Sequence, residues 1–302
     1  MIPGYRLIEM LGVGATATVY LAEGPGGRKV ALKIPKAEAL RDPVLGRMIS
    51  QEVSLYRVLS HPSILPAYGG TAGGEHPFLA LMYCPSGPVS AGRREPAVIL
   101  QVLSDVAAAL QYLHGKHIIH QDVKPSNIFE EGGRGYLADF GAAASEAQPW
   151  RTAGSPFYMA PELFNGERNS PRSDLYALGV VAYELLTGVR PIHGTTYDEV
   201  RAAHLSAVPS HVRAHGRDLP KAAASVIDRA LSKDPAARPA VAEFQDAMQR
   251  AIRELHGRAT IEEAPPAPIA AVVAAPARRI EASAMRVKDE PGFLDRLLRR
   301  RK

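Results

Sequence analysis

The stretch His120–Asn127 reads HQDVKPSN, and after a short predicted hairpin the chain reads DFG at Asp139–Gly141. A carboxylate, an ammonium group and an amide therefore stand close together, and a second carboxylate follows the hairpin. Carboxylate and amide oxygens are hard donors of the kind that Mg²⁺ prefers. A lysine beside them can offset negative charge that moves during a reaction. The residue types of the two motifs suit a site that handles Mg²⁺ and negative charge.

Both motifs resemble those of the protein kinase family, whose catalytic loop and Asp-Phe-Gly motif have this pattern. Ala160–Glu162 reads APE, which matches the end of that family's activation segment, and the resemblance covers residues 5 to about 255. It implies that Asp122 is the catalytic base that accepts the proton of the substrate hydroxyl. It also implies that Asn127 and Asp139 are the metal ligands, holding Mg²⁺ (or Mn²⁺) against the phosphates of ATP.

The choice of acceptor is a separate inference from two features. Lys124 stands two residues after the implied base, and Gly154–Tyr158 reads GSPFY. Both resemble serine/threonine kinases, in which a residue such as Ser155 shapes the pocket beside the acceptor hydroxyl. The resemblance therefore implies transfer of the γ-phosphoryl group of ATP to serine or threonine in protein substrates. Compact loops and an Ala/Arg-rich composition are most similar to bacterial members of the family.

Two further motifs resemble structural parts of the same family. Asp174–Gly179 reads DLYALG, which is similar to the helix start that anchors the catalytic loop from below. Arg238 follows an Asp-Pro pair and resembles the arginine that pairs with Glu162. We expect these residues to hold the loop rather than to take part in the reaction.

A glycine-bearing segment, GVGATATV at Gly12–Val19, lies between two predicted strands. Glycines in a hairpin let backbone N–H groups approach phosphate oxygens, whereas a dinucleotide-binding motif opens a helix inside a βαβ unit. Ala17 stands where a third glycine is usual, and an ordinary glycine-bearing hairpin remains an alternative. Val30–Lys33, VALK, ends an apolar strand with a lysine placed to hold the α- and β-phosphates. A solvent-facing strand lysine is the alternative there.

A lysine in that position needs a carboxylate to orient it, and Glu52 lies on the next predicted helix. We expect Lys33 and Glu52 to pair. Because Glu is a common helix former, a solvated residue on the helix face is the alternative reading of Glu52. The other motifs favour the pair.

The resemblance also implies which residues surround the nucleotide. Leu81 is placed as the gatekeeper, Met82 to Cys84 as the backbone strip that faces adenine, and Val19 and Ala31 as apolar walls. Cys84 is expected to be a buried, inert thiol. The full set of expected nucleotide-binding residues is Leu11, Gly12, Val13, Gly14, Val19, Ala31, Lys33, Leu81, Met82 and Cys84.

Hydrophobic periodicity predicts an α+β fold of two lobes, the protein-kinase-like arrangement. Residues 1–84 are expected to form a small antiparallel sheet with one substantial helix, and residues 85–257 a mainly α-helical lobe beyond a hinge at Pro85–Pro88. The expected strands are Arg6–Gly12, Thr18–Glu23, Lys29–Ile34, Ile64–Tyr68 and Pro77–Met82. The expected helices are Leu45–Leu59, Pro96–Gly115, Ser173–Thr187, Tyr197–Leu205, Lys221–Leu231 and Val241–Leu255.

Residues 258–302 have a different composition. Glu262–Ala277 is rich in Ala and Pro and cannot repay the entropy of ordering a fold, which predicts a disordered tail. The tail ends in a basic amphipathic segment, in which Phe293, Leu294, Leu297 and Leu298 alternate with arginines. A solvated end is one interpretation, and docking to a membrane surface or a partner is the other.

Composition excludes several other classes of protein. Among the 302 residues, 36 basic and 31 acidic ones are interspersed, so the net charge of +5 predicts no nucleic-acid partner. One cysteine excludes an intramolecular disulfide framework and favours the cytoplasm. The N-terminus lacks the pattern of a signal peptide. The longest apolar run, Ala267–Ala277, is far below the roughly 20 residues needed to span a bilayer, so no transmembrane helix is expected. The oligomeric state is left open.

Gln121 is the main departure from the family pattern, because many kinases have arginine immediately before the catalytic aspartate. That arginine receives the phosphate of a phosphorylated activation segment, and a neutral glutamine cannot form the charge-assisted pair. We therefore expect activity that does not require phosphorylation at Thr152, although autophosphorylation of Thr152 or Ser145 stays open.

Two rival functions remain. The first is a pseudokinase, a scaffold that regulates partners by its conformation. The presence of Lys33, Glu52, Asp122, Asn127 and Asp139 argues against that reading. The second is phosphorylation of small molecules, which is disfavoured because the segment ending at Ala160–Glu162 resembles a peptide-docking platform.

Overall fold

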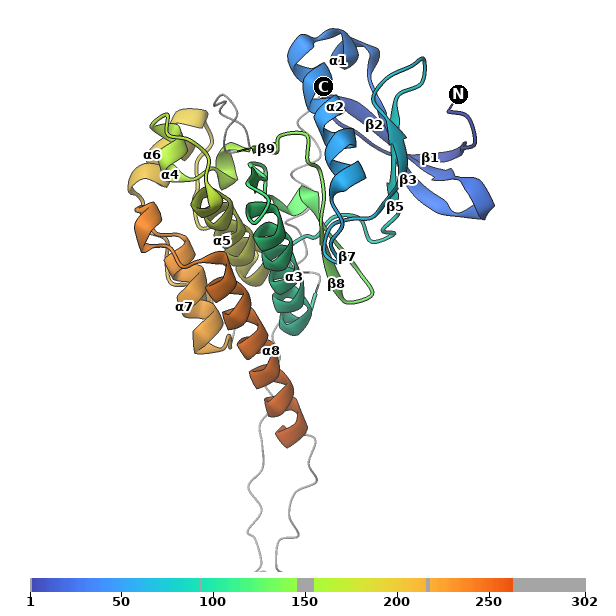
Figure 1. Ribbon diagram of the computed structural model, residues 1–302. Helices are drawn as coiled ribbons and strands as arrows, with labels where there is room; N and C mark the ends of the chain where they lie inside the picture. Colours follow the sequence, from blue (N-terminus) through green and yellow to red (C-terminus); the bar gives the residue numbers. More distant parts are fainter. Residues whose placement is uncertain (1, 93, 146–154, 216–217, 263–302) are drawn as a thin grey trace, which may run out of the picture. The chain divides into compact units, whose positions relative to one another are not determined.

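The computed structural model describes residues 2–92, 94–145, 155–215 and 218–262 (Figure 1). The chain up to Glu262 forms one compact unit. The remaining predicted tail, residues 263–302, lies outside the described residues, and so do Thr152 and Gly154.

The N-terminal part is a five-stranded sheet, as the alternating pattern predicts, and every neighbouring pair of strands is antiparallel. The strand that was expected to begin at Ile64 begins instead at Ala67. Pro66 has no N–H to donate, and the residues before it pair elsewhere. Leu65 N–H donates to Leu137 O at 2.9 Å, which ties the sheet to the other half of the molecule. In spatial order the strands are β1 (Arg6–Val13), β2 (Ala17–Glu23), β3 (Lys29–Pro35), β5 (Phe78–Met82) and β4 (Ala67–Thr71).

One long helix, α2 (Pro43–Val58), lies beside this sheet (Figure 1). It begins two residues before the expected start, because the Asp42 side chain accepts hydrogen bonds from the first-turn N–H groups and Pro43 takes the first helical position. A short helix that was not expected, α1 (Ala37–Arg41), precedes it. Because Glu52 is among the buried residues of α2, a carboxylate faces the interior of this lobe.

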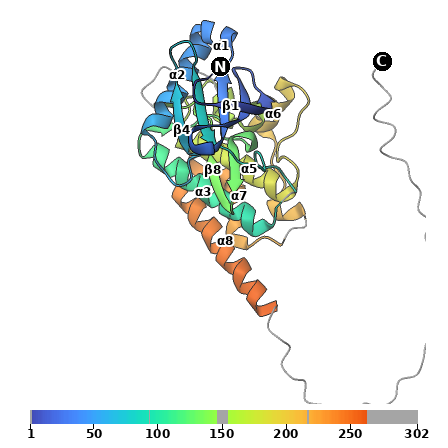
Figure 2. The same ribbon diagram turned by 90° about the vertical axis from the view of Figure 1, so that its right-hand side faces the viewer.

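The C-terminal part is mainly helical, as expected. The central helix α5 is capped by Ser170, whose hydroxyl accepts from Ser173 N–H, and is buried along almost its whole length. Helices α3 and α8 lie side by side (Figure 2). The helices are α3 (Pro96–His114), α4 (Pro161–Phe164), α5 (Pro171–Thr187), α6 (Tyr197–Ser206), α7 (Lys221–Ala230) and α8 (Val241–Glu262).

Two small strand pairs frame the motifs of this lobe. The hairpin of β7 (Ile128–Glu131) and β8 (Arg134–Leu137) separates the HQDVKPSN stretch from DFG. Strand β6 (Ile118–Ile119), before the first motif, pairs with β9 (Ala144–Ser145), after the second, so segments on either side of the motifs meet. Two-residue strands carry no readable periodicity, and β6 and β9 were not expected.

Helix α8 continues beyond its expected end at Leu255 as far as Glu262. Extending an existing helix adds one hydrogen bond for each residue that is fixed, and Ala, Arg and Glu are good helix formers. The first residues assigned to the tail from their composition therefore extend the helix.

Helix α3 is unusually rich in apolar residues. Among the described helices it is the one that is long and apolar enough to cross a bilayer by those criteria alone. Most of its apolar residues, including Leu100, Leu103 and Leu110, are fully buried against the rest of the lobe. This burial is what the central helix of a protein core requires.

Candidate active site

A cavity of about 660 Å³ opens between the sheet and the helical lobe. Its size falls in the range of pockets that bind small molecules. Val13 is the one expected residue that does not line it, and this residue is 60% exposed at the end of β1. The expected residues that do line it are Leu11, Gly12, Gly14, Val19, Ala31, Lys33, Glu52, Leu81, Met82, Cys84, Asp122, Lys124, Asn127 and Asp139.

The inner end of the cavity is apolar. Ala31 on β3 is paired in register with Leu81 on β5, and Val19 comes from β2. The chain then leaves β5 through Cys84, which is 6% exposed. Burial raises the pKa of the Cys84 thiol to about 11, so the thiol stays protonated and unreactive at neutral pH. These surfaces suit a flat, apolar group such as a nucleobase.

The glycine-bearing hairpin forms the roof of the cavity. Gly12 has an ordinary backbone conformation, and a Cβ placed on it would meet no atom within 4 Å. Gly14 would meet only the Ala17 carbonyl oxygen, at 3.4 Å. Neither the backbone nor the packing requires glycine at these two positions. The residue type is explained by the close approach of a ligand to the backbone, as for phosphate oxygens.

Lys33 is held by two carboxylates. Its Nζ lies 2.7 and 2.8 Å from the two Glu52 carboxylate oxygens and 3.4 Å from Asp139 Oδ1. Burial by itself would lower the pKa of Lys33, but the charges of Glu52 and Asp139 outweigh it and raise this pKa. The ammonium group is therefore charged at neutral pH and lies where it can meet phosphate oxygens.

The buried ring of Phe140 anchors the Asp-Phe-Gly segment. Phe140 is fully buried, with ring centroids 4.9 Å from Tyr56 on α2 and 5.4 Å from His120. Asp139 takes a left-handed backbone conformation, φ 65°, which turns its carboxylate up toward Lys33. Burial acts to raise the pKa of Asp139, but the Lys33 charge and the Gly141 N–H lower it overall. Asp139 is thus ionised at neutral pH.

Asp174 at the start of α5 holds the HQDVKPSN stretch. Its two carboxylate oxygens each lie 2.9 Å from a backbone nitrogen of that stretch, those of His120 and Gln121. The His114 ring adds a third contact at 2.8 Å. Gln121 is left-handed, with φ 69°, a strained conformation that these bonds maintain. Asp174 therefore has the anchoring position that its motif predicts.

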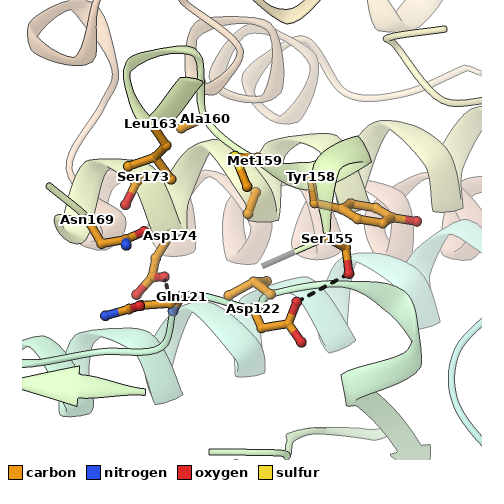
Figure 3. Close-up of a pocket in the computed structure, with 12 residues that line it drawn as sticks. Gln121, Asp122, Ser155, Tyr158, Met159, Ala160, Leu163, Asn169, Ser173 and Asp174 are labelled. Atoms are coloured by element: carbon orange, nitrogen blue, oxygen red, sulfur yellow. Dashed lines mark hydrogen bonds between the residues drawn. The ribbon is translucent and has the colours of Figure 1, made fainter. Parts of the chain in front are cut away.

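Both oxygens of the Asp122 carboxylate have hydrogen-bond partners, and Figure 3 shows the contact of one of them with Ser155. Lys124 Nζ donates to Asp122 Oδ2 at 2.6 Å and to Ser155 Oγ at 3.1 Å. The Ser155 hydroxyl lies 3.3 Å from Asp122 Oδ1. Asn127 Nδ2 also donates to the Asp122 backbone carbonyl at 2.8 Å. A carboxylate oriented in this way can accept a proton from a hydroxyl that approaches from the cavity.

The donor set fits a divalent metal ion. Asn127 uses its Nδ2 to hold Asp122, which leaves its Oδ1 as a ligand. Asp139 is 43% exposed at its side chain and lies at the same cavity. Mg²⁺ is commonly held by one or two protein oxygens together with substrate phosphates and water, so an amide and a carboxylate are sufficient. Within the described residues no cluster of three His, Cys, Asp or Glu offers a metal site made by the protein alone.

A second ion pair lies deep in the helical lobe. Arg238 donates to both oxygens of Glu162, at 2.7 and 2.6 Å, and the two side chains are 0% and 5% exposed. The remaining guanidinium donors bond to backbone carbonyls, including that of Ser232. The pair predicted from the APE motif therefore fixes the segment that follows Ser155.

Several lining residues were not predicted. Phe129, Leu65 and Ala138 form part of the cavity wall. Phe129 had a usable signal, because it stands only two residues after Asn127, which was itself expected at the site. Leu65 had none, since it reaches the cavity through its pairing with the distant Leu137.

Comparison with known proteins agrees with this geometry. Residues 5–250 match the model of the protein kinase domain family. The chain is 34% identical to serine/threonine-protein kinase Pkn1 of Myxococcus xanthus, with 90% of this chain and 41% of that protein covered. It is 34% identical to PknJ of Mycobacterium tuberculosis (89% and 48%) and 29% identical to PrkC of Bacillus subtilis (80% and 39%), both also serine/threonine-protein kinases.

The chain spans less than half the length of these relatives. The match nevertheless covers most of this chain, including both lobes and every motif described above. The predicted resemblance and the two-lobed fold are thus confirmed, and the chain belongs to the protein kinase family.

Proposed function

We propose that this chain is an ATP-dependent protein serine/threonine kinase that uses Mg²⁺ and acts in the cytoplasm. The observation that carries the proposal is the position of Asp122. Its carboxylate, held by Lys124 and Ser155, faces the same cavity as the Lys33 ammonium group. The bacterial relatives are named serine/threonine-protein kinases, which supports serine and threonine as acceptors.

The site residues would each have a separate role in one in-line displacement at the γ-phosphorus of ATP. The acceptor hydroxyl oxygen bonds to the γ-phosphorus of ATP, the bond to the β–γ bridging oxygen breaks, and the hydroxyl proton passes to an Asp122 oxygen. Lys33 orients the phosphates, and Lys124 lies where it can offset charge on the group in transit. A divalent ion bound by Asn127 and Asp139 would supply further neutralisation of phosphate charge.

One assay tests the proposed activity. The purified chain of residues 1–302 is incubated with radiolabelled ATP and a protein substrate in Mg²⁺, in Mn²⁺ or in EDTA, beside Asp122→Asn. We expect transfer that the variant reduces by about 10³-fold or more, because the proton acceptor is lost. Phosphoamino acid analysis should show serine or threonine. Wild-type protein that binds ATP without transferring phosphate would favour the scaffold instead.

The proposal includes independence from phosphorylation of residues 146–154. Among the described residues, Lys33 is oriented by Glu52 and Asp139, and the Asp122 carboxylate by Lys124. At position 121 the side chain is a neutral amide, which cannot form a charge-assisted pair with a phosphate. Asp174 holds this part of the loop by backbone hydrogen bonds that need no modification.

Thr152→Ala tests this part of the proposal. We expect the variant to keep kcat within about threefold of the wild type, since no charge-assisted pair to a phosphate is lost. Both proteins should be treated with phosphatase first and checked by mass spectrometry. A fall of about a hundredfold would show that the segment must be phosphorylated. Gln121→Arg offers a sharper comparison, because it should make activity depend on Thr152.

A further inference from the structure

A very small cavity lies between the HQDVKPSN stretch and the start of α5 (Figure 3). Its volume is about 10 Å³, which is close to the space that one water molecule requires. Gln121 and Asp122 line it from the loop, and Asn169 and Ser173 line it from the other side. The site is therefore too small for a metabolite but not for water.

Asn169 has an unsatisfied group at this cavity. Its Oδ1 is buried and has no hydrogen-bond partner among the described residues. The neighbouring polar groups are already engaged: the Ser173 hydroxyl bonds to the Ser170 backbone, and Asp174 accepts from three groups. A buried acceptor without a partner destabilises the folded state, so a partner is expected here.

Gln121 offers the complementary group. Its side chain lines the same cavity, and none of the hydrogen bonds described for this residue uses the side-chain amide. A water molecule can donate to Asn169 Oδ1 and to the Gln121 amide oxygen, or accept from the Gln121 amide nitrogen. The two amides come from different segments, one next to the proposed base and one before α5.

We propose that this cavity holds one ordered water that hydrogen-bonds to the side chains of Asn169 and Gln121. Asn169 is thereby a positioning residue, which steadies the left-handed backbone at Gln121 and the Asp122 carboxylate beside it. The inference rests on the proposed kinase function. Many kinases have an arginine at the position of Gln121, and that arginine depends on a phosphate as its partner. In this chain the water would join two neutral side chains, and this contact needs no phosphate.

The first test is Asn169→Leu, which keeps the size of the side chain and removes the acceptor. We expect kcat to fall about tenfold while KM for ATP stays within about twofold, because the loop and not the nucleotide site is disturbed. The thermal midpoint should not rise. A variant with full kcat and an equal or higher midpoint would overturn the proposal, because removing a merely orphaned acceptor stabilises.

The control is Asn165→Leu, which alters an exposed asparagine at the end of α4. It should leave kcat and the midpoint unchanged. If Asn169→Leu does not fold, Gln121→Leu tests the same water from the other side, with the same tenfold expectation. The double variant should lose no more than the larger single loss, whereas multiplied losses would exclude a shared water.

A crystal structure of the wild-type chain gives a readout that does not depend on activity. Density for one water within about 2.7–3.2 Å of both amides supports the proposal, and its absence at a resolution that shows other buried waters overturns it. A wild-type chain that has this water but transfers no phosphate would contradict the proposed function and leave the water site standing.

Discussion

Two buried ion pairs in this chain have similar chemistry and different surroundings. Lys33–Glu52 joins β3 to α2 at the wall of the large cavity, and its lysine side chain is 18% exposed. Arg238–Glu162 lies inside the helical lobe, where the arginine is 0% exposed. All five N–H donors of Arg238 have acceptors, whereas Lys33 is shared between Glu52 and the carboxylate of Asp139.

The difference shows which pair serves stability and which serves the reaction. The Arg238–Glu162 pair is closed to water, so removing one of the two residues leaves the charge of the other buried and unpaired. A pair at the edge of a cavity can be reached by water and by ligand oxygens, which makes its charge usable. Exposure of the cation, rather than the strength of its contacts, separates the two roles.

The largest expected effect concerns the closed pair. Arg238→Met should lower the free energy of unfolding by about 3–5 kcal/mol, because Glu162 is left buried without its partner. Urea unfolding measures the change. The control is Arg229→Met, which breaks an ion pair with Glu243 whose side chains are 48% and 45% exposed and should cost less than about 1 kcal/mol. Similar losses in both variants would remove the distinction.

The next effect concerns the pair at the cavity. Lys33→Met should lower kcat/KM by about 10²–10³-fold, which equals about 3–4 kcal/mol of transition-state stabilisation. The free energy of unfolding should change by less than about 2 kcal/mol, because water can reach the group. Lys29→Met, on the same strand but exposed, should leave both quantities unchanged. A Lys33 variant that unfolds as readily as the Arg238 variant would show that both pairs are structural.

The smallest expected effect is on how the stability of the folded chain depends on pH near the Arg238–Glu162 pair. Arg238 lies over the ring of Tyr176, whose hydroxyl is 2.9 Å from Nδ1 of the fully buried His204. Burial, and then the charge of Lys233, lower the pKa of His204 to about 4. The unfolded chain takes up this proton first, so stability falls as the pH drops below the unfolded value of 6.5.

Between pH 7.5 and pH 5 this group should cost the folded state about 2 kcal/mol. Urea unfolding of the wild type and His204→Gln at both pH values isolates that contribution, since the variant should lose less stability on acidification by that amount. His193→Gln, which alters an exposed histidine, should follow the wild type. An identical pH dependence in all three proteins would place the acid sensitivity elsewhere.

Local patterns identified most of the elements and most of the cavity's residues. The two-residue period of apolar positions located five strands, and the period of three to four residues located the long helices, each within a few residues of the observed bounds. Capping explains part of the remaining difference, since the helices capped by Asp42 and Ser170 each begin two residues before the expected start. The reversed strand order, in which β5 lies between β3 and β4, follows from pairing and could not be read from any single segment.

The sequence by itself determined the residue types of the site, their order and the family to which the chain belongs, because those are carried by short motifs with local spacing. Only the tertiary structure decided that Lys33 meets Asp139 across 106 residues, that Leu65 reaches the cavity and that Val13 does not. It alone also placed Asn169 opposite Gln121. Such contacts depend on how whole elements pack against each other, and no local period records that packing.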